Sequence, residues 1–151
     1  MEIVEMAARI EAPADVVWSF SGNFGDKTLS RGYVERVEVT GSGVGALRTY
    51  HLREEIGKGH VVERLERLDE RDRILEYSMV DNGPVPWTGY RGHISVTPAG
   101  ADACMVLIRT QFVPVGIDGA EVAALSRANI GRYFDNLRAA VSAQIAATSG
   151  D

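Results

Sequence analysis

Hydrophobic and polar residues alternate along six segments of the chain, a pattern typical of β-strands that bury one face. These segments are 3–10, 33–40, 46–53, 73–80, 87–97 and 104–113. Short turns such as 69–72 and 98–100 connect neighbouring segments. Strands joined by turns this short pair with each other in opposite directions, so the pattern predicts an antiparallel sheet.

Residues 60–70 fit two patterns. Val61, Leu65 and Leu68 have helical spacing, whereas Val61, Glu63 and Leu65 alternate as in a strand. Periodicity alone does not choose between them. Because strand-like segments flank this stretch on both sides, a strand that continues the antiparallel meander is the more economical interpretation.

Helical patterns lie at the two ends of this strand-rich region. Two short helices are expected after the first strand, over 14–20 and 24–29. A long amphipathic helix is expected from Asp118 to about residue 147, because apolar residues recur there at helical spacing. Asp118 is the expected N-cap, with Glu121 as its capping-box partner. The fold class is therefore α+β, with the C-terminal helix lying along the sheet.

The chain has 151 residues, of which 45% are hydrophobic, and a net charge of −5. This length suffices for one stable core, so a single domain over residues 1–151 is expected. The acidic balance argues against a nucleic-acid partner. No apolar run approaches the roughly 20 residues of a membrane span, and no secretory signal is visible. A cytoplasmic monomer or homodimer without stable membrane insertion is expected.

No metal or cofactor is expected from the residue types that usually hold them. The three histidines are scattered, and the single cysteine, Cys104, lies in an apolar run typical of a buried, inert thiol. His51 and His93 fall in the outward phase of their strands. The glycine-rich segment 41–45 lacks the Lys-Ser/Thr of a phosphate loop and precedes a strand, so a hairpin turn is expected.

Several stretches, taken in order, carry a family resemblance: 10–18 at the first strand and helix, 43–48 at the glycine turn, 62–65 with 68–69, Tyr77, Tyr90, and 133–137 on the last helix. They resemble the START-like (SRPBCC) superfamily, in its polyketide cyclase/dehydrase and lipid-transport branch, which is related to the plant abscisic-acid receptors and the birch-pollen allergen. The resemblance covers essentially the whole chain. It implies a helix-grip fold, in which a curved antiparallel sheet of about seven strands wraps around the C-terminal helix, and it makes residues 60–70 a strand.

The resemblance also implies a cavity between the sheet and the long helix, with Leu125, Asn129 and Tyr133 of that helix as its cover. Strand alternation predicts which side chains of the sheet face inward. The residues expected to bind a hydrophobic small molecule are Trp18, Glu35, Arg48, Tyr50, Met79, Trp87, Thr110, Phe112, Asn129 and Tyr133. A plain core is the alternative interpretation, but this many polar groups among aromatic residues are more typical of a ligand pocket.

Glu63 lies, by resemblance, where the abscisic-acid receptors carry a carboxylate inside the cavity. Apolar surroundings favour a neutral carboxyl group, whereas Arg48 on the adjacent strand favours the carboxylate. In the first case Glu63, together with Tyr77 and Tyr90, is the expected catalytic group for acid/base chemistry. In the second case Glu63 and Arg48 form an ion pair that is structural or anchors a polar ligand group.

Two functions follow from the resemblance. The first is a cofactor-independent cyclase/dehydratase-type enzyme, a lyase or isomerase. The second is a non-catalytic carrier or sensor of a hydrophobic metabolite or lipid, with Trp87 in the turn 81–87 at the gate. A third and weaker hypothesis, a module whose closure over its ligand creates a protein interface, rests only on the apolar residues 85–87. The fold does not choose among these functions.

Overall fold

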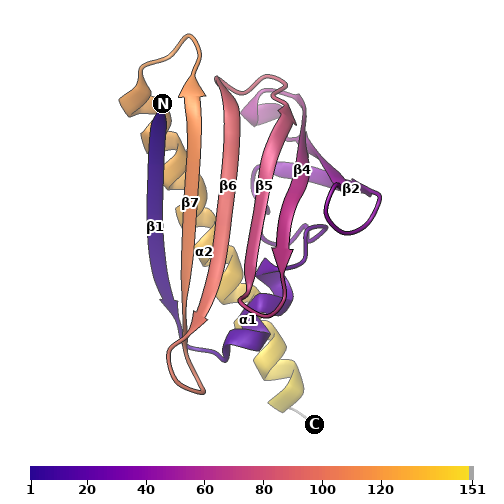
Figure 1. The fold of residues 1–151 in the computed structure, drawn as a ribbon, viewed down its shortest axis with the longest axis vertical. Coiled ribbons are helices and arrows are strands. Elements are labelled where there is room, and N and C mark those ends of the chain that lie inside the picture. Colours follow the sequence, from indigo (N-terminus) through magenta and orange to yellow (C-terminus); the bar gives the residue numbers. More distant parts are fainter. Residues whose placement is uncertain (150–151) are drawn as a thin grey trace.

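The computed structural model describes residues 1–149 and contains one seven-stranded sheet, a short helix and a long C-terminal helix (Figure 1). The elements in chain order are β1 (Glu2–Ile10), α1 (Ala14–Ser21), β2 (Val34–Thr40), β3 (Leu47–Leu52), the 3₁₀ turn η1 (Glu54–Ile56), β4 (Gly59–Asp69), β5 (Ile74–Asp81), β6 (Trp87–Pro98), β7 (Cys104–Pro114) and α2 (Gly119–Ser149). The predicted α+β class and the helix-grip layout are confirmed.

The strands lie in the order β1-β7-β6-β5-β4-β3-β2, and all of the pairs are antiparallel. Strands β2 to β7 are adjacent in the sheet in the same order as in the chain, and β1 is the edge strand beside β7. Helix α2 runs behind the sheet, from the end of the sheet where the chain begins to the opposite end (Figure 1). The sheet therefore has an inner face toward α2 and an outer face away from it.

Residues 60–70, which fit both patterns, form a strand. Strand β4 pairs with β3 on one side and with β5 on the other, so its side chains alternate between the two faces. Val61, Glu63 and Leu65 are buried on the inner face, as strand alternation predicts. The glycine-rich segment 41–45 is the turn between β2 and β3, and Gly41, Gly43 and Gly45 all have positive φ, which a hairpin of this kind requires.

The expectation of a second short helix at 24–29 is wrong. Residues 22–33 form successive turns between α1 and β2. The Oδ1 atom of Asp26 accepts hydrogen bonds from the backbone N–H groups of Thr28 and Leu29, at 2.6 and 3.2 Å. The Oδ1 atom of Asn23 accepts one from Gly25 at 3.2 Å. Asn and Asp side chains that bond to nearby backbone in this way favour turns over a continuing helix.

Asp118 directly precedes helix α2, as expected of its N-cap, and its Oδ1 accepts a hydrogen bond of 2.8 Å from the N–H of Ala120. Its buried side is lined by Val122, Ala123, Ser126, Ile130, Phe134, Leu137 and Val141. Leu125, expected on the cavity side, is 45% exposed. The prediction followed the apolar residues, but at this turn of α2 the buried position is held by a polar residue, Ser126.

Candidate functional site

A cavity of about 160 Å³ lies between the inner face of the sheet and α2. Side chains from five strands, from α2 and from the turns after α1 and β5 line it. The predicted residues that it brings together are Arg48, Tyr50, Glu63, Tyr77, Met79, Trp87, Tyr90, Thr110, Phe112, Asn129 and Tyr133. These residues thus surround a cavity, and the alternative interpretation, a plain hydrophobic core, does not describe this part of the structure.

All five tyrosines of the chain line this cavity. They are Tyr33, Tyr50, Tyr77, Tyr90 and Tyr133, and they come from four different elements and one turn. Burial raises the pKa of every one of their hydroxyl groups, to about 12 for Tyr33 and well above the ordinary value for Tyr50 and Tyr77. The hydroxyls therefore stay protonated at neutral pH, and each of them has both donor and acceptor capacity.

Arg48 and Glu63 form a buried ion pair in the wall of the cavity. They are direct cross-strand neighbours on β3 and β4, and Nε of Arg48 donates to Oε1 of Glu63 at 2.8 Å. Nη1 of Arg48 donates to the carbonyl oxygen of Phe24 at 3.1 Å. Among residues 1–149, no protein group bonds to Nη2 of Arg48 or to Oε2 of Glu63. One nitrogen atom, Nη2, and one oxygen atom, Oε2, of the pair thus remain for a ligand.

Three aromatic rings surround the Arg48 guanidinium. Its Cζ lies 4.3 Å from the ring centre of Phe24, 4.8 Å from that of Tyr50 and 4.7 Å from that of Tyr77. Cation–π contacts of this kind stabilise the guanidinium. Burial alone lowers the pKa of Arg48, but the nearby Tyr50, Glu63 and Tyr77 reverse this effect, and its pKa is raised overall. The pair is therefore a fixed, charged group in aromatic surroundings.

Four aromatic rings form one continuous wall of the cavity. The ring centres of Tyr77 and Tyr90 are 6.2 Å apart, and those of Tyr90 and Trp87 are 5.7 Å apart. Phe112 lies 5.9 Å from Tyr90 and 5.8 Å from Trp87. This aromatic wall extends from the Arg48 guanidinium to the end of the sheet where β6 begins.

Gly92 makes room for this wall. It lies opposite Tyr77 on β5 and Thr110 on β7, and a Cβ atom added to it would lie 2.2 Å from Cζ of Tyr77. The Tyr77 ring thus covers a position on β6 where no side chain stands. Any larger residue at position 92 would displace the ring from the cavity wall.

Polar contacts tie the helices to the rest of the cavity. Oγ1 of Thr110 on β7 lies 3.0 Å from Oγ of Ser126 on α2, and the Tyr133 hydroxyl donates to Oγ of Ser21 at 3.0 Å. Ser126 and Ile130 line the cavity although sequence reasoning did not place them there. Their spacing of four residues is the signal, because it continues the buried stripe that begins at Val122.

Two predicted ligand-binding residues, Trp18 and Glu35, lie outside the cavity. The Trp18 ring is buried in the core beside Gly22, and its Nε1 donates to Oε2 of Glu70 at 2.6 Å. Glu35 is exposed because the pairing of β2 with β3 shifts between Val34 and Arg36. This bulge at Glu35 breaks the alternation on which the prediction depended.

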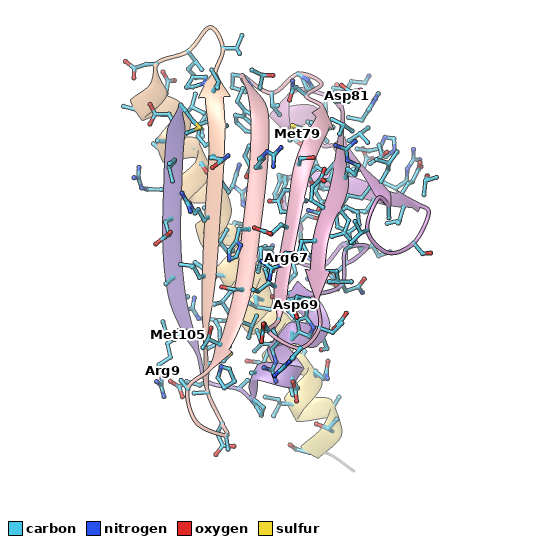
Figure 2. All side chains as sticks on the ribbon, in the orientation of Figure 1. Arg9, Arg67, Asp69, Met79, Asp81 and Met105 are labelled. Atoms are coloured by element: carbon cyan, nitrogen blue, oxygen red, sulfur yellow. The ribbon has the colours of Figure 1, made fainter. Side chains whose placement is uncertain are left out.

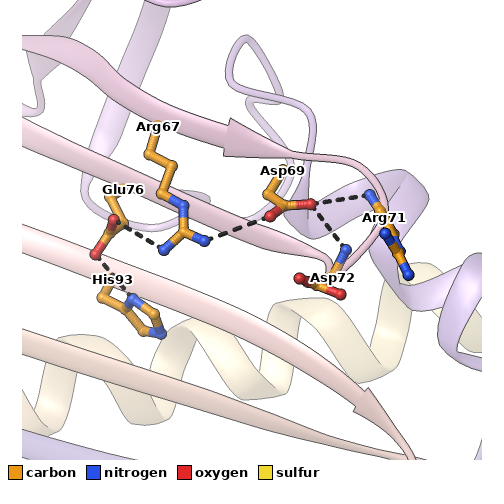
Figure 3. Close-up of polar contacts among 6 residues, drawn as sticks. All are labelled: Arg67, Asp69, Arg71, Asp72, Glu76 and His93. Atoms are coloured by element: carbon orange, nitrogen blue, oxygen red, sulfur yellow. Dashed lines mark hydrogen bonds and ion pairs between the residues drawn. The ribbon is translucent and has the colours of Figure 1, made fainter.

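The outer face of the sheet carries charged side chains around a second hollow of about 330 Å³, which is more open than the inner cavity and is lined by residues such as Glu5, Glu66 and Arg91. Cross-strand neighbours Glu5, Arg109, His93, Glu76 and Arg67 form one row over five strands. Figure 3 shows Arg67 between Glu76 and Asp69, at 3.6 and 3.4 Å, with His93 on the other oxygen of Glu76 at 3.1 Å. In Figure 2 the face of the sheet that carries Arg67 is turned toward the viewer, and α2 lies behind the sheet. Arg67, Glu76 and His93 thus pair with one another.

The remaining chemistry of the described residues adds no second site. Within residues 1–149, no group of three or more His, Cys, Asp and Glu residues is placed to hold a metal ion. Cys104 is fully buried, and burial raises the pKa of its thiol. His51 and His93 lie on the outer face, as expected. Neither helix of this part of the chain is long and apolar enough to cross a membrane.

Solved structures of other proteins share this fold. A START superfamily protein from Mycobacterium smegmatis matches with a TM-score of 0.80 and 13% identity over 94% of this chain and 98% of that one. The Zhui aromatase/cyclase from Streptomyces sp. R1128 has a TM-score of 0.73 and 19% identity, over 95% and 92%. Norcoclaurine synthase from Thalictrum flavum, in complex with dopamine and hydroxybenzaldehyde, has a TM-score of 0.73 and 20% identity, over 93% and 86%.

A family model covers nearly the whole chain. It is described as polyketide cyclase / dehydrase and lipid transport, and it matches residues 1–142. These residues include every strand and the part of α2 that lines the cavity. The chain therefore belongs to the polyketide cyclase/dehydrase and lipid transport family and has the START-type helix-grip fold.

Proposed function

We propose that this protein binds a small molecule built on one apolar ring, with a hydroxyl group at its polar end, in the cavity beneath α2. The observation that carries the proposal is the convergence of five tyrosines and one buried ion pair on a single cavity. Replacing a buried ion pair by apolar residues is often neutral or stabilising. A core that served stability alone would therefore gain nothing from Arg48 and Glu63.

The size of the cavity limits the ligand. Cavities for drug-sized ligands have volumes of about 300 to 1,000 Å³, and an engineered cavity of about 150 Å³ holds benzene. The volume here, about 160 Å³, suits one ring with short substituents. The phenols dopamine and hydroxybenzaldehyde bound to the norcoclaurine synthase neighbour support a ligand of this class.

The Arg48–Glu63 pair supplies the recognition of the hydroxyl group. A hydroxyl both donates and accepts a hydrogen bond. Nη2 of Arg48 is a donor and Oε2 of Glu63 is an acceptor, and neither has a protein partner in the described part of the chain. A ligand hydroxyl between these two atoms satisfies both of them, while the ring lies against the aromatic wall.

Isothermal titration calorimetry with three probes tests this proposal. We expect 4-ethylphenol to bind about ten-fold more tightly than ethylbenzene, since the two differ only in the hydroxyl group. Decanoate, a long-chain probe, should not bind. Equal affinity for 4-ethylphenol and ethylbenzene, or a preference for decanoate, would contradict the proposal.

Two substitutions on α2 locate the binding. Ile130 lines the cavity and is buried, whereas Leu125 on the same helix is 45% exposed. Ile130→Phe should fill the cavity and abolish 4-ethylphenol binding, at a cost in stability of about 1 to 3 kcal/mol. Leu125→Phe, the matched control, should bind the probe as the wild type does. Equal binding by both variants would place the ligand elsewhere.

Acid/base catalysis at Glu63 is the second candidate function, and the unpaired Oε2 atom favours it. A carboxylate oxygen facing a bound ketone can remove a proton from the carbon next to the carbonyl and return it, which is the first step of many cyclisations. The probe reaction is exchange of the methyl protons of acetophenone in D₂O, followed by NMR. Acetophenone has no hydroxyl group, so its ketone is the polar end that would lie at the Arg48–Glu63 pair. We expect Glu63→Asp, which keeps the charge but moves the oxygen, to slow this exchange. If the exchange is no faster with the protein than without it, the catalytic role is wrong and binding remains as the function.

A further inference from the structure

Trp87 carries a buried polar atom that the protein does not satisfy. Its Nε1 is enclosed by protein atoms and, among residues 1–149, has no hydrogen-bond partner. A buried donor without an acceptor costs roughly 1 to 3 kcal/mol. The other tryptophan is the contrast, because Nε1 of Trp18 donates to Glu70 at 2.6 Å. Of the two tryptophans, only the one that lines the cavity lacks a partner in this part of the chain. The other buried polar side-chain atom without a partner there is Oδ1 of Asn82, in the turn before β6.

The backbone of β6 brings this side chain to the inner face. In a regular strand, residues three positions apart point to opposite faces, so Trp87 and Tyr90 would not share one. The pairing of β6 with β7 shifts between Thr88 and Arg91, and Gly89 within this bulge has a φ of +63°. Trp87 and Tyr90 then both line the cavity. Bulges that re-aim a side chain in this way are common next to binding sites.

Trp87 lies at the far end of the aromatic wall from Arg48. The wall connects the two residues through Tyr77 and Tyr90, and both ends line the same cavity. The indole is partly exposed and lines the cavity, but its Nε1 is itself enclosed. Binding of a ligand atom to this N–H group therefore requires the indole to turn about its Cβ–Cγ bond when the ligand enters. Such a rotation presents the N–H group to an atom in the cavity.

We propose that the Trp87 N–H group binds an acceptor oxygen of the ligand, at the end of the ring opposite the hydroxyl group. The ligand class is then a hydroxyaryl ketone, ester or similar carbonyl compound. This inference rests on the proposed function, because it takes the hydroxyl end of the ligand to lie at the Arg48–Glu63 pair. Trp87 acts in it as a specificity-determining residue that distinguishes a carbonyl oxygen from an alkyl group.

The test compares 4-hydroxyacetophenone with 4-isopropylphenol, in which a methyl group replaces the carbonyl oxygen. Because the carbonyl also makes the phenol more acidic, the informative quantity is the change in preference between the wild type and Trp87→Phe. This substitution keeps an aromatic ring beside Tyr90 and Phe112 but removes the N–H group. We expect the preference for the ketone to fall roughly five- to ten-fold in Trp87→Phe. An unchanged preference overturns the inference.

A measurement on the wild type keeps the test independent of the folding of that variant. In ¹H–¹⁵N NMR spectra, the indole N–H signal of Trp87 should move downfield on addition of 4-hydroxyacetophenone and not on addition of 4-isopropylphenol. The signal of Trp18, whose N–H is already bonded to Glu70, is the internal control. If both probes bind and the Trp87 signal responds to them alike, this inference alone is wrong. If neither probe binds, the proposed function fails and the inference fails with it.

Discussion

Two arginine–glutamate pairs in this sheet have nearly the same Nε–Oε1 distance and opposite surroundings; one joins β3 to β4 and the other lies along β4. The Arg48–Glu63 pair joins at 2.8 Å on the inner face, with side chains that are 9% and 5% exposed. The Arg64–Glu66 pair joins at 2.7 Å on the outer face, with side chains that are 49% and 33% exposed. An exposed pair of this kind contributes about 0 to 1 kcal/mol to stability. The same bond therefore has a different role on each face.

The surroundings explain the difference. On the outer face, Glu66 also accepts a hydrogen bond from Ser78 at 2.6 Å, and water is available to whatever remains. On the inner face, the pair is enclosed, and Nη2 of Arg48 and Oε2 of Glu63 have no protein partner in the described part of the chain. A ligand in the cavity can therefore bond to both atoms. The comparison teaches that a short ion pair indicates a binding site only when it is enclosed and incompletely satisfied.

The largest expected effect is the loss of charge on the inner pair. Glu63→Gln leaves the Arg48 guanidinium buried without its counter-charge and should lower the free energy of unfolding by about 3 to 5 kcal/mol. Glu66→Gln, the matched change three positions along β4 on the outer face, should lower it by less than about 1 kcal/mol. Urea unfolding of the two variants measures both values. Equal losses would show that enclosure does not distinguish the pairs.

An intermediate effect is expected at Gly92. A Cβ atom at this position collides with the Tyr77 ring, so Gly92→Ala should lower the free energy of unfolding by about 1 to 3 kcal/mol and weaken binding of 4-ethylphenol. The control is Gly131→Ala on α2, where an added Cβ meets nothing within 4 Å and helix propensity favours alanine by up to about 1 kcal/mol. If Gly92→Ala binds the probe as well as the wild type does, the Tyr77 ring is not part of the site.

The smallest effect is expected from pH. Burial raises the pKa of Tyr33 from the ordinary 10.0 to about 12 in the folded state. Well below pH 10 this hydroxyl is protonated in both the folded and the unfolded state, so it does not make the free energy of unfolding vary with pH. Between the two values the unfolded chain binds fewer protons than the folded protein, so the free energy of unfolding falls as pH rises. Ultraviolet absorbance checks the cause, because tyrosinate should form at higher pH in the folded protein than in urea. Coincident titrations would contradict the burial of the tyrosines.

Alternation predicted most of the inner face although three of the six strand pairs contain a shift in register. Arg48 and Glu63 are opposite each other on β3 and β4, which pair regularly, and both lie in the cavity as expected. Glu35 does not, because a shift in the register of β2 with β3 turns it outward. Bulges of one residue leave no clear mark on the hydrophobic pattern, so sequence reasoning cannot place the residues beside them.

The helices show a second limit of the pattern. The inner side of α2 includes Ser126, which bonds to Thr110, so the polar residue belongs to the face that hydrophobicity would assign to apolar ones. Trp18 shows the converse, because an aromatic residue expected at the ligand is buried in the core and bonded to Glu70. The errors at Ser126 and Trp18 have one cause. In each case the hydrogen-bond partner, Thr110 or Glu70, is distant in the chain, and the local pattern does not show it.

The account depends most on the claim that the open positions of the inner pair bind the polar end of a ligand. The direct measurement is a ¹H–¹⁵N NMR titration with 4-ethylphenol, in which the arginine Nε–H signals are followed. The signal of Arg48 should shift on addition of the probe, while the signal of Arg64, in the matched pair on the outer face, should stay in place. A shift at Arg64 with none at Arg48, or no shift at either, would contradict the account.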